Sequence, residues 1–577
     1  MMLICLKNMV AELSIYSDKS TTKEGILSKT VRHSDHSNSL GTNQLFIITG
    51  NSIVRWKKGK EMKKSLSLIL SIVLILSLFS GFTVNAFAAD APVRGGTLIA
   101  AKTSDISNLN PTKTNARADD RYIIGQIYEP LIGLDESGNY IPQLATSWEM
   151  DDTKLVLTLR EDVVFHDGTK FNAEAVKSVL EWYLSDECAH VYKSEIAEIS
   201  SIEVLGEYKV QLNLSAQSAA LIGALANVAG YMISPAAIAE YGDDLSTHAV
   251  GTGPFILKEY VVGDHVTLVR NENYYELGAD GLALPYLDEV VVKIITDDSV
   301  KTTNLMTGDI DLVDWNNSIN STLTLQGVSG IKTIQTPATD TYVLLINAGD
   351  AQLSDVRVRQ AVSFAINREE VAEAMTEGLG QPAAFLATSN QWYYDEYNPY
   401  SYDPAKAKEL LAEAGYPDGI TITLRYISRE PDNTIAQLLQ AELKESGINL
   451  QIEAMERLAW VEMHHTNQGG ELGFAKFNGP RVDAYQQYNQ MKGYITKNCA
   501  EWDRYGQQLI DLLEQSKQTY NIEERKAILS EFQKLDLDNC ANIFVYSNSR
   551  YTSWNEKVEG VIIEVDGTWN LKAAWLK

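Results

Sequence analysis

The stretch Gly251–Tyr275, GTGPFILKEYVVGDHVTLVRNENYY, predicts a sharp turn followed by a pair of strands. Its two early glycines have free backbone torsions and the proline after them fixes the next φ, so the chain is expected to turn there. Phe255–Val262 and His265–Arg270 are rich in β-branched and aromatic residues. Gly263-Asp264 between them suits a two-residue type II′ turn. The stretch therefore predicts a β-hairpin, which alone would fit any mixed domain.

A second segment of the chain has an equally specific order. Residues 141–183 contain LATSWE, LTLRED and FHDGTKFNAEAV, with an alternating strand pattern at 155–160 and a one-sided helix pattern at Asn172–Tyr183. Together with GTGP-aromatic, Gly-Asp and RNENYY of Gly251–Tyr275, this order resembles the family 5 extracellular solute-binding proteins. Members of that family deliver peptides, nickel and some other solutes to ABC importers. The resemblance covers essentially all of residues 95–577.

This resemblance implies an α/β, two-lobed, periplasmic-binding-protein-like fold of the large type II class, in which the first lobe has an extra subdomain. We expect lobe I at 89–340 plus 552–577 and lobe II at 341–551. Two crossing strands, near Thr341–Asn347 and Ala541–Ser547, are expected to form the hinge. The alternation of predicted helices and strands in the second lobe indicates its own sheet. One of these helices is predicted over Asp355–Glu373.

The N-terminal part of the chain has the pattern of a targeting segment. A positive run begins at Lys63-Lys64, Leu66–Phe82 is apolar, and the small-residue end VNAFA closes at Ala88. This order predicts a signal peptide at 62–88 with cleavage after Ala88. A membrane anchor is the alternative, although the apolar run is at the short limit for crossing a bilayer. Residues 1–61 precede a complete signal, so we expect them to be an upstream extension outside the native protein.

Charge and cysteine content constrain the partners and the compartment. The formal net charge is −27, and because residues 1–88 hold 11 Lys+Arg and 5 Asp+Glu, the remainder carries −33. Such an acidic surface disfavours nucleic acid and anionic membranes. No cysteine lies at Leu78–Phe82, so we expect an exported, soluble monomer without a lipid anchor, periplasmic or extracellular. Export permits a disulfide, for which Cys499 and Cys540 are the more plausible pair, and Cys188 would then stay unpaired.

Catalytic motifs are missing from the sequence. There is no GxSxG, no HExxH and no P-loop. His464-His465 are adjacent, and on a helix they would point about 100° apart, which makes them poor joint metal ligands. We therefore predict no enzyme activity, no cofactor and no metal. The predicted function is an ABC importer's substrate-binding component that takes an oligopeptide or dipeptide to a permease. The alternatives are the same fold binding a metal chelate or an oligosaccharide, or a secreted hydrolase.

Candidate ligand-binding residues lie on loops that are expected to face the cleft. Three consecutive aromatic residues from Trp392 to Tyr394 cannot all point inward on one loop, and Trp460 stands where the family often places a cleft aromatic residue. Aromatic side chains in a cleft supply contact area for the ligand, and a few polar groups fix the orientation of the ligand. The predicted ligand-binding residues are Asp120, Arg121, Trp392, Tyr393, Trp460, Asn478, Arg481 and Asp483.

The segment Gly473–Tyr488 corresponds to the family's ligand-reading segment. Peptide-binding members tend to have Gly-Trp and later Asp-Pro there, whereas this chain has Gly473-Phe474 and Asp483-Ala484. The nickel branch uses a histidine where this chain has Ala475, and its arginines are missing from Asn227–Met232. Arg481 and Asp483 can read the carboxylate and ammonium of a zwitterion, or pair with each other or with solvent.

Overall fold

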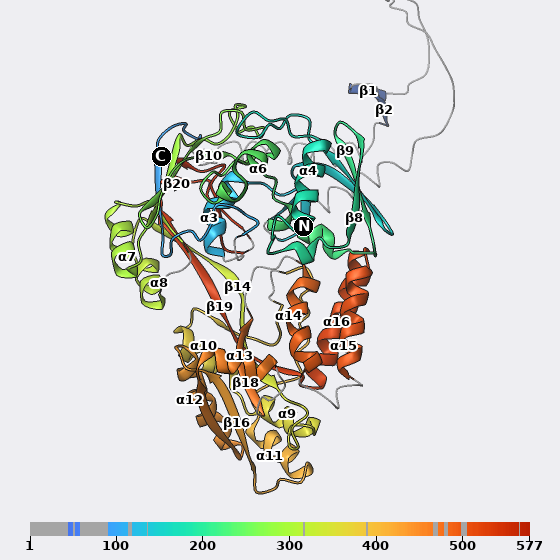
Figure 1. Ribbon diagram of the computed structural model, residues 1–577, viewed down its shortest axis with the longest axis vertical. Helices are drawn as coiled ribbons and strands as arrows, with labels where there is room; N and C mark the ends of the chain where they lie inside the picture. Colours follow the sequence, from blue (N-terminus) through green and yellow to red (C-terminus); the bar gives the residue numbers. More distant parts are fainter. Residues whose placement is uncertain are drawn as a thin grey trace, which may run out of the picture. The chain divides into compact units, whose positions relative to one another are not determined.

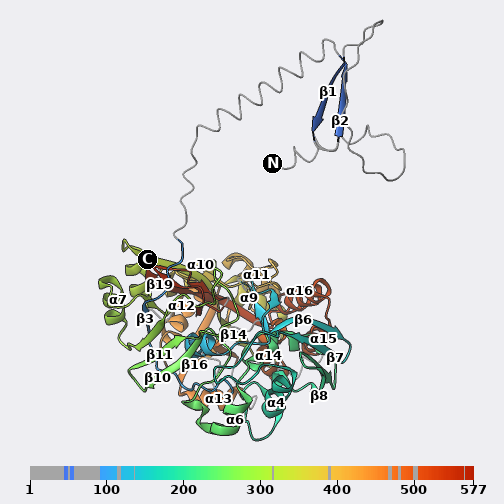
Figure 2. The ribbon, with the colours of Figure 1, turned by 90° about the horizontal axis from the view of Figure 1, so that it is seen from above.

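The computed structural model describes residues 44–49, 52–57, 91–113, 118–135, 137–314, 318–387, 391–465, 471–477, 483–497, 505–564 and 566–577. The chain forms two compact units, Met1–Ala89 and Asp90–Lys577. In the first unit, strands β1 (Gln44–Thr49) and β2 (Ser52–Lys57) form an antiparallel pair (Figure 2). The predicted signal peptide at 62–88 lies outside the described residues.

One mixed sheet runs through the second unit (Figure 1). In the described part of the chain it has 11 strands in the order β10-β11-β12-β3-β13-β19-β14-β18-β16-β17, with β15 paired to β19. These strands are β3 (Thr97–Lys102), β10 (Phe255–Val261), β11 (His265–Arg270), β12 (Glu289–Ile294), β13 (Leu312–Val313), β14 (Ile331–Ile346), β15 (Gln381–Pro382), β16 (Ile420–Ile427), β17 (Ile448–Met455), β18 (Leu472–Phe477) and β19 (Asn542–Asn555).

Two separate hydrophobic cores flank the middle of this sheet. The first is built from residues between Leu98 and Leu312 together with Trp554–Ala574, and the second from residues between Tyr342 and Tyr546. We call the parts around these cores lobe I and lobe II. The long strands β14 and β19 pass from one to the other, paired antiparallel from Ile331 to Leu345 (Figure 1). The two segments predicted to form the hinge therefore lie side by side.

Lobe I adds smaller sheets and helices to its share of the main sheet. A four-stranded sheet has the order β6-β7-β9-β8 and packs against α4, and β4 and β5 form a short hairpin. The bounds are β4 (Ile132–Leu134), β5 (Tyr140–Pro142), β6 (Ala145–Asp151), β7 (Lys154–Leu159), β8 (Ile199–Gly206), β9 (Lys209–Leu214), α3 (Ala118–Ile127), α4 (Ala173–Leu184), α5 (Ala220–Leu225), α6 (Pro235–Tyr241), α7 (Asp298–Thr307) and α8 (Ile319–Gln326).

The C-terminal segment of the chain returns to lobe I after β19. There β20 (Val558–Glu559) pairs with β23 (Trp575–Leu576), and β21 (Ile562–Ile563) pairs with β22 (Trp569–Asn570). Trp569 is buried in the lobe I core and its ring lies 4.1 Å from that of Tyr122 on α3. The last residues of the chain are therefore part of the same lobe as β3, the first strand of the second unit.

The stretch that first suggested the fold is confirmed as a hairpin of β10 and β11, but the predicted two-residue turn at Gly263-Asp264 is wrong: Val261 pairs with His265, so the loop has three residues, 262–264. Its glycines allow close packing, because a Cβ on Gly251 would lie 2.1 Å from the carbonyl oxygen of Ile127 at the end of α3. Glu129, two residues later, accepts hydrogen bonds from Thr252 at 2.9 Å and from Tyr274 and Tyr275 at 2.8 Å each. One buried carboxylate thus joins the start and the end of the GTGP…NENYY stretch to α3.

Lobe II consists of its strands and the helices between and after them. Their bounds are α9 (Val356–Phe364), α10 (Arg368–Thr376), α11 (Pro404–Glu413), α12 (Asp432–Glu445), α13 (Arg457–His465), α14 (Ala484–Lys497), α15 (Tyr505–Gln518) and α16 (Ile522–Asp538). The prediction of one helix over Asp355–Glu373 is wrong. The segment forms α9 and α10, because the Asn367 side chain accepts from the backbone N–H of Glu370 and begins a new helix.

Candidate ligand-binding site

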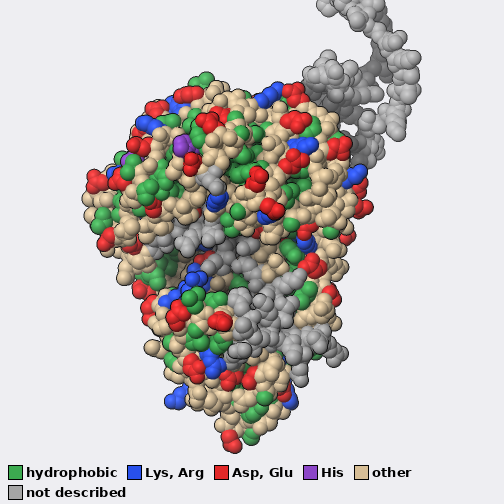
Figure 3. Space-filling view, in the orientation of Figure 1, with side chains coloured by type: hydrophobic (Ala, Val, Ile, Leu, Met, Phe, Trp, Pro, Cys, Tyr) green, Lys and Arg blue, Asp and Glu red, His purple; other side chains and the backbone are tan. Residues whose placement is uncertain are grey.

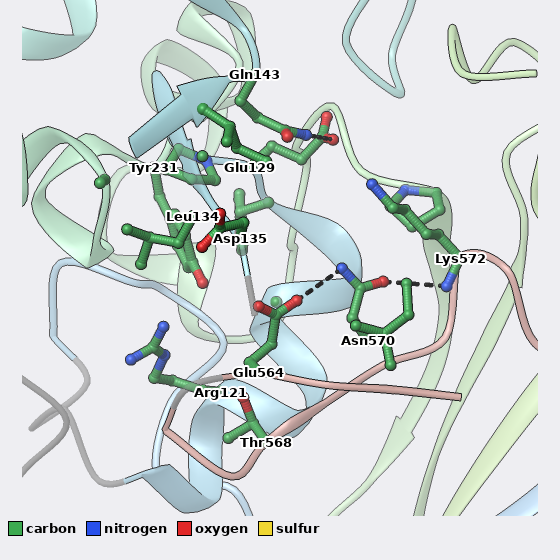
Figure 4. Close-up of a pocket in the computed structure, with 18 of the residues that line it drawn as sticks. Arg121, Glu129, Leu134, Asp135, Gln143, Tyr231, Glu564, Thr568, Asn570 and Lys572 are labelled. Carbon is green, nitrogen blue, oxygen red and sulfur yellow. Dashed lines mark hydrogen bonds between the residues drawn. The ribbon is translucent and has the colours of Figure 1, made fainter. Parts of the chain in front are cut away.

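A cavity of about 540 Å³ lies in lobe I beside α3 (Figure 4). Its walls come from the C-terminal half of α3, the β4–β5 hairpin, and the C-terminal segment of the chain. The side chains labelled in the figure are Arg121, Glu129, Leu134, Asp135, Gln143, Tyr231, Glu564, Thr568, Asn570 and Lys572. Segments from both ends of the second unit therefore build one cavity.

Arg121, one of the residues predicted from sequence, lines this cavity. Its Nη1 lies 2.7 Å from Oδ2 of the buried Asp566. Burial works against the charged form of Asp566, but the Arg121 guanidinium and hydrogen bonds from Thr568 hold the pKa of that carboxyl below its usual value. Among the described residues, Nε of Arg121 has no hydrogen-bond acceptor. The guanidinium thus keeps one unused donor.

Two other carboxylates of the cavity lack the direct ion pair that Asp566 forms, although the charges of Arg121 and Lys572 act on Glu564. In the described part of the chain, neither Glu564 nor Asp135 forms an ion pair, and Glu564 accepts one hydrogen bond, 3.0 Å long, from Nδ2 of Asn570. Burial raises the pKa of Glu564. Asp135 has a lowered pKa because Asn139 and neighbouring backbone N–H groups donate to it. Figure 4 shows the Glu564 carboxylate pointing into the middle of the cavity.

Aromatic rings form much of the remaining wall. Tyr128, Tyr231, Tyr274 and Trp569 all line the cavity and are each at most 5% exposed. The indole N–H of Trp569 has no acceptor among the residues that the structure describes. The wall therefore offers apolar area to a ligand.

A second cavity, of about 410 Å³, lies against the hinge strands. Asp340 on β14 forms two ion pairs. Its Oδ1 lies 3.1 Å from Nη2 of Arg550 on β19, and its Oδ2 lies 3.3 Å from Nζ of Lys476 on β18. Arg550 also donates to the carbonyl oxygen of Asp566, the partner of Arg121. A line of charged groups therefore connects lobe II, the hinge and the first cavity. Basic side chains are visible at the boundary between the lobes in Figure 3, while acidic ones are scattered over both lobes.

Comparison with known proteins decides the family. The profile of bacterial extracellular solute-binding proteins, family 5 middle, matches residues 139–498. This chain belongs to family 5 of the bacterial extracellular solute-binding proteins. Glutathione-binding protein GsiB of Shigella dysenteriae serotype 1 is 30% identical over 394 residues, which are 67% of this chain and 75% of that protein.

Solved structures show the same fold. The periplasmic binding protein DppA of Helicobacter pylori, in complex with peptide STSA, has a TM-score of 0.65 and 24% identity over 84% of this chain and 98% of its own. NikA of Brucella suis, in complex with Fe(III)-EDTA, has a TM-score of 0.72 and 22% identity over 84% and 100%. The two-lobed α/β fold expected from the sequence is thus confirmed, and the family is one of solute-binding proteins.

The structure buries Asp483 of this family 5 protein in an ion pair. Its two oxygens lie 2.6 and 2.7 Å from Nη1 and Nη2 of Arg525 on α16. The hydroxyl of Tyr140, from lobe I, lies 3.4 Å from the same carboxylate. The Arg525 guanidinium also lies over the ring of Trp392, 5.5 Å from its centre. Asp483 and Trp392, both predicted from sequence, thus contact the same residue, Arg525, which sequence reasoning missed.

The other predicted residues lie in several places. Tyr393 is 1% exposed and contacts Trp392 and Tyr488, and the indole N–H of Trp460 donates to the carbonyl oxygen of Arg425 at 3.1 Å. Asp120 accepts the backbone N–H of Ser107 at 2.9 Å. Asn478 and Arg481 lie outside the described residues.

Three further expectations concern metal, membrane and disulfide. No group of three or more potential metal ligands occurs among the described residues. Within the same residues, no helix has the length and apolar character that crossing a membrane requires. Cys188 and Cys540 are buried, and Sγ of Cys540 lies 2.9 Å from the hydroxyl of Tyr400. Cys499, the expected partner of Cys540, lies outside the described residues.

Proposed function

We propose that this protein is the substrate-binding component of an ABC importer that captures a short peptide-like solute between its lobes and delivers it to a permease. The lobe I cavity carries the proposal. At about 540 Å³ it has the size of a small-molecule site. Its wall combines aromatic side chains with the carboxylate of Glu564, which forms no ion pair among the described residues. A peptide offers apolar side chains to the rings and an ammonium to this carboxylate.

The relatives support a peptide-like ligand. GsiB is named a glutathione-binding protein, and the Helicobacter pylori structure contains a peptide. Among the residues predicted from sequence, we propose Arg121 as a direct ligand contact because it lines the cavity. Asp120 beside it is proposed to position the start of α3. On the side of lobe II we propose that Trp392, Asn478 and Arg481 complete the site.

Two further parts of the proposal concern processing and movement. The protein is proposed to be exported with cleavage after Ala88 and to work as a monomer. The lobes are proposed to close over the ligand by rotation about β14 and β19, because these two paired strands pass from one lobe to the other.

The test is direct binding to the protein comprising residues 89–577. Mass spectrometry under non-denaturing conditions would identify any ligand that co-purifies. Isothermal titration calorimetry would then compare a dipeptide, a tripeptide, glutathione, nickel-histidine and an oligosaccharide, with the solution assayed afterwards for cleavage products. We expect saturable binding of peptides without cleavage. Binding of nickel-histidine or the oligosaccharide alone, or turnover of peptides, would overturn the proposal.

A further inference from the structure

Three helices of lobe II, α14, α15 and α16, reach as far as lobe I. Their apolar faces belong to the lobe II core, to which they contribute Tyr488, Leu513 and Phe532 among other residues. Figure 1 shows the three helices between the body of lobe II and the strands β8 and β9, and α14 contacts α5 of lobe I. The lobes therefore meet at a second place, apart from the hinge strands β14 and β19.

The end of α15 is tied to lobe I by polar contacts. Nζ of Lys517 forms an ion pair with Glu198, just before β8, and the two side chains are only 19% and 16% exposed. The carbonyl oxygen of Lys517 accepts the backbone N–H of Ala219 at 2.6 Å. The hydroxyl of Tyr520 accepts the backbone N–H of Ser218 at 3.2 Å. Both backbone N–H groups before α5 are thus bonded across the boundary between the lobes.

The start of α14 approaches lobe I closely. A Cβ on Gly223 of α5 would lie 2.6 Å from Cβ of Asp483 and 3.0 Å from the hydroxyl of Tyr140. That hydroxyl lies 3.4 Å from the Asp483 carboxylate. One turn further along α14, Nε2 of Gln486 donates to Glu195 of lobe I at 2.9 Å. The lobes approach this closely because residue 223 has no side chain.

The same elements of lobe I also form part of the cavity wall. Ala226, which ends α5, lines the cavity, and so does Ile141, the neighbour of Tyr140 on β5. A ligand in the cavity therefore touches the two elements that meet lobe II. Each group in the contact between the lobes belongs to the chain itself, so no ligand is needed to complete it.

We propose that these contacts, made to lobe I by Asp483, Gln486, Lys517 and Tyr520, form a latch that stabilises the closed lobes. The free protein then visits the closed form on its own, and a bound ligand leaves only when the latch opens. This rests on the proposed function, and it adds that Lys517 and its partner Glu198 control how long a ligand is retained.

Hydrogen–deuterium exchange of the protein comprising residues 89–577 reads the latch directly. The backbone N–H groups of Ser218 and Ala219 donate to lobe II, so they are protected while the latch is closed. Mass spectrometry under non-denaturing conditions first verifies that no ligand has co-purified. In the free protein we expect these two groups to exchange roughly threefold or more slowly than unprotected amides. Saturation with Ala-Ala-Ala should slow their exchange further.

Gly223→Ala tests the close approach of the lobes. Alanine favours a helix more than glycine does, so α5 itself accepts the change. The new Cβ meets Asp483 of the other lobe, and overpacking of this kind typically shifts an equilibrium by roughly fivefold to 100-fold. Exchange at Ser218 and Ala219 should therefore rise to the unprotected rate, and Ala-Ala-Ala should dissociate at least about fivefold faster in stopped-flow fluorescence. Gly206→Ala, with open space around it, is the control.

A charge swap tests the ion pair. Lys517→Glu places a second carboxylate beside Glu198 and should quicken peptide dissociation by roughly fivefold. Adding Glu198→Lys restores an opposite pair and should return the rate to within about twofold of wild type. Lys534 on α16 pairs with Asp395 inside lobe II, so Lys534→Glu should leave exchange at residues 218–219 and the dissociation rate unchanged. Thermal unfolding checks that each variant is folded, and if Gly223→Ala does not fold, the charge swap decides.

The outcomes separate the latch from the proposed function. Protection in the free protein that is lost in Lys517→Glu and regained in the double variant supports the latch. If residues 218–219 exchange as unprotected amides in free wild type, or if the swap changes neither exchange nor dissociation, the inference is overturned while peptide binding stands. If wild type binds no peptide, the proposed function is contradicted, and the exchange of the free protein still decides whether the latch forms.

Discussion

The buried ion pair between Asp483 and Arg525 should be costly to break by removing one partner. The side chains are 0% and 5% exposed, and both oxygens of the carboxylate are engaged by the guanidinium at 2.6 and 2.7 Å. Arg525→Met removes the positive charge and leaves Asp483 buried without its partner. It also removes the hydrogen bond from Nε to the carbonyl oxygen of Ser516, 2.7 Å long.

The expected cost follows from this geometry. Breaking a buried ion pair by removing one partner typically costs about 3–5 kcal/mol, because an uncompensated charge stays buried. Replacing both partners, in Asp483→Asn/Arg525→Met, removes that charge and should recover at least about 2 kcal/mol relative to the single variant. As a matched control, Lys406→Met breaks the exposed pair with Glu409 and should cost at most about 1 kcal/mol.

Urea denaturation of the four proteins at pH 7, followed by tryptophan fluorescence, measures these differences. A single Arg525→Met variant that loses less than about 1 kcal/mol would refute the reasoning. A fifth protein, the single variant Asp483→Asn, tests the predicted role of Asp483 in ligand binding. If Asp483 reads a ligand ammonium, Asp483→Asn weakens a free-amine peptide far more than its acetylated form. If it serves only Arg525, it weakens both alike.

Three further predictions follow from the fold. Burial raises the pKa of Asp536 to about 7, so protonation of this carboxyl favours the folded state. Its contribution to stability is present below about pH 4 and is lost as the pH rises towards 7. Urea denaturation should therefore show that wild type loses about 1–3 kcal/mol more than Asp536→Asn between pH 5 and pH 8. Gly251→Ala places a Cβ against a backbone oxygen and should lower the free energy of unfolding by at least about 1–3 kcal/mol, whereas Gly206→Ala, with open space around it, should change it by less than about 1 kcal/mol. Small-angle scattering should show a smaller radius of gyration on saturation with a bound peptide, and an unchanged radius would argue against lobe closure.

Local patterns predicted most of the fold. The hairpin after GTGP and the helix after FHDG appeared within a residue or two of their expected places, because turn residues and apolar periodicity are encoded over short stretches. The break at Asn367 was missed. The apolar positions continue across it, and only the side chain of Asn367, which caps the second helix, shows that the chain starts again.

The candidate site was harder to predict than the fold. Arg121 was predicted as part of a loop, whereas the structure places it in helix α3, where it lines the cavity. Its partner Asp566 and the carboxylate of Glu564 stand more than 440 residues later, in a segment whose local pattern resembles any short hairpin. In the same way, nothing near Asp483 indicates that Arg525, 42 residues further on, will occupy its carboxylate.

The reason lies in how the chain passes between the lobes. Because β19 brings the chain back from lobe II to lobe I, the last residues fold against α3, which is among the first elements of the second unit. Gln126 of α3 donates to the carbonyl oxygen of Trp569 at 2.9 Å and accepts the backbone N–H of Leu571 at 3.0 Å, which fixes this contact. The C-terminal segment therefore supplies part of the charge of the cavity, beside Arg121, Glu129 and Asp135. The profile match covers residues 139–498, so the charges that Glu564, Asp566 and Lys572 bring to this cavity lie outside the matched range.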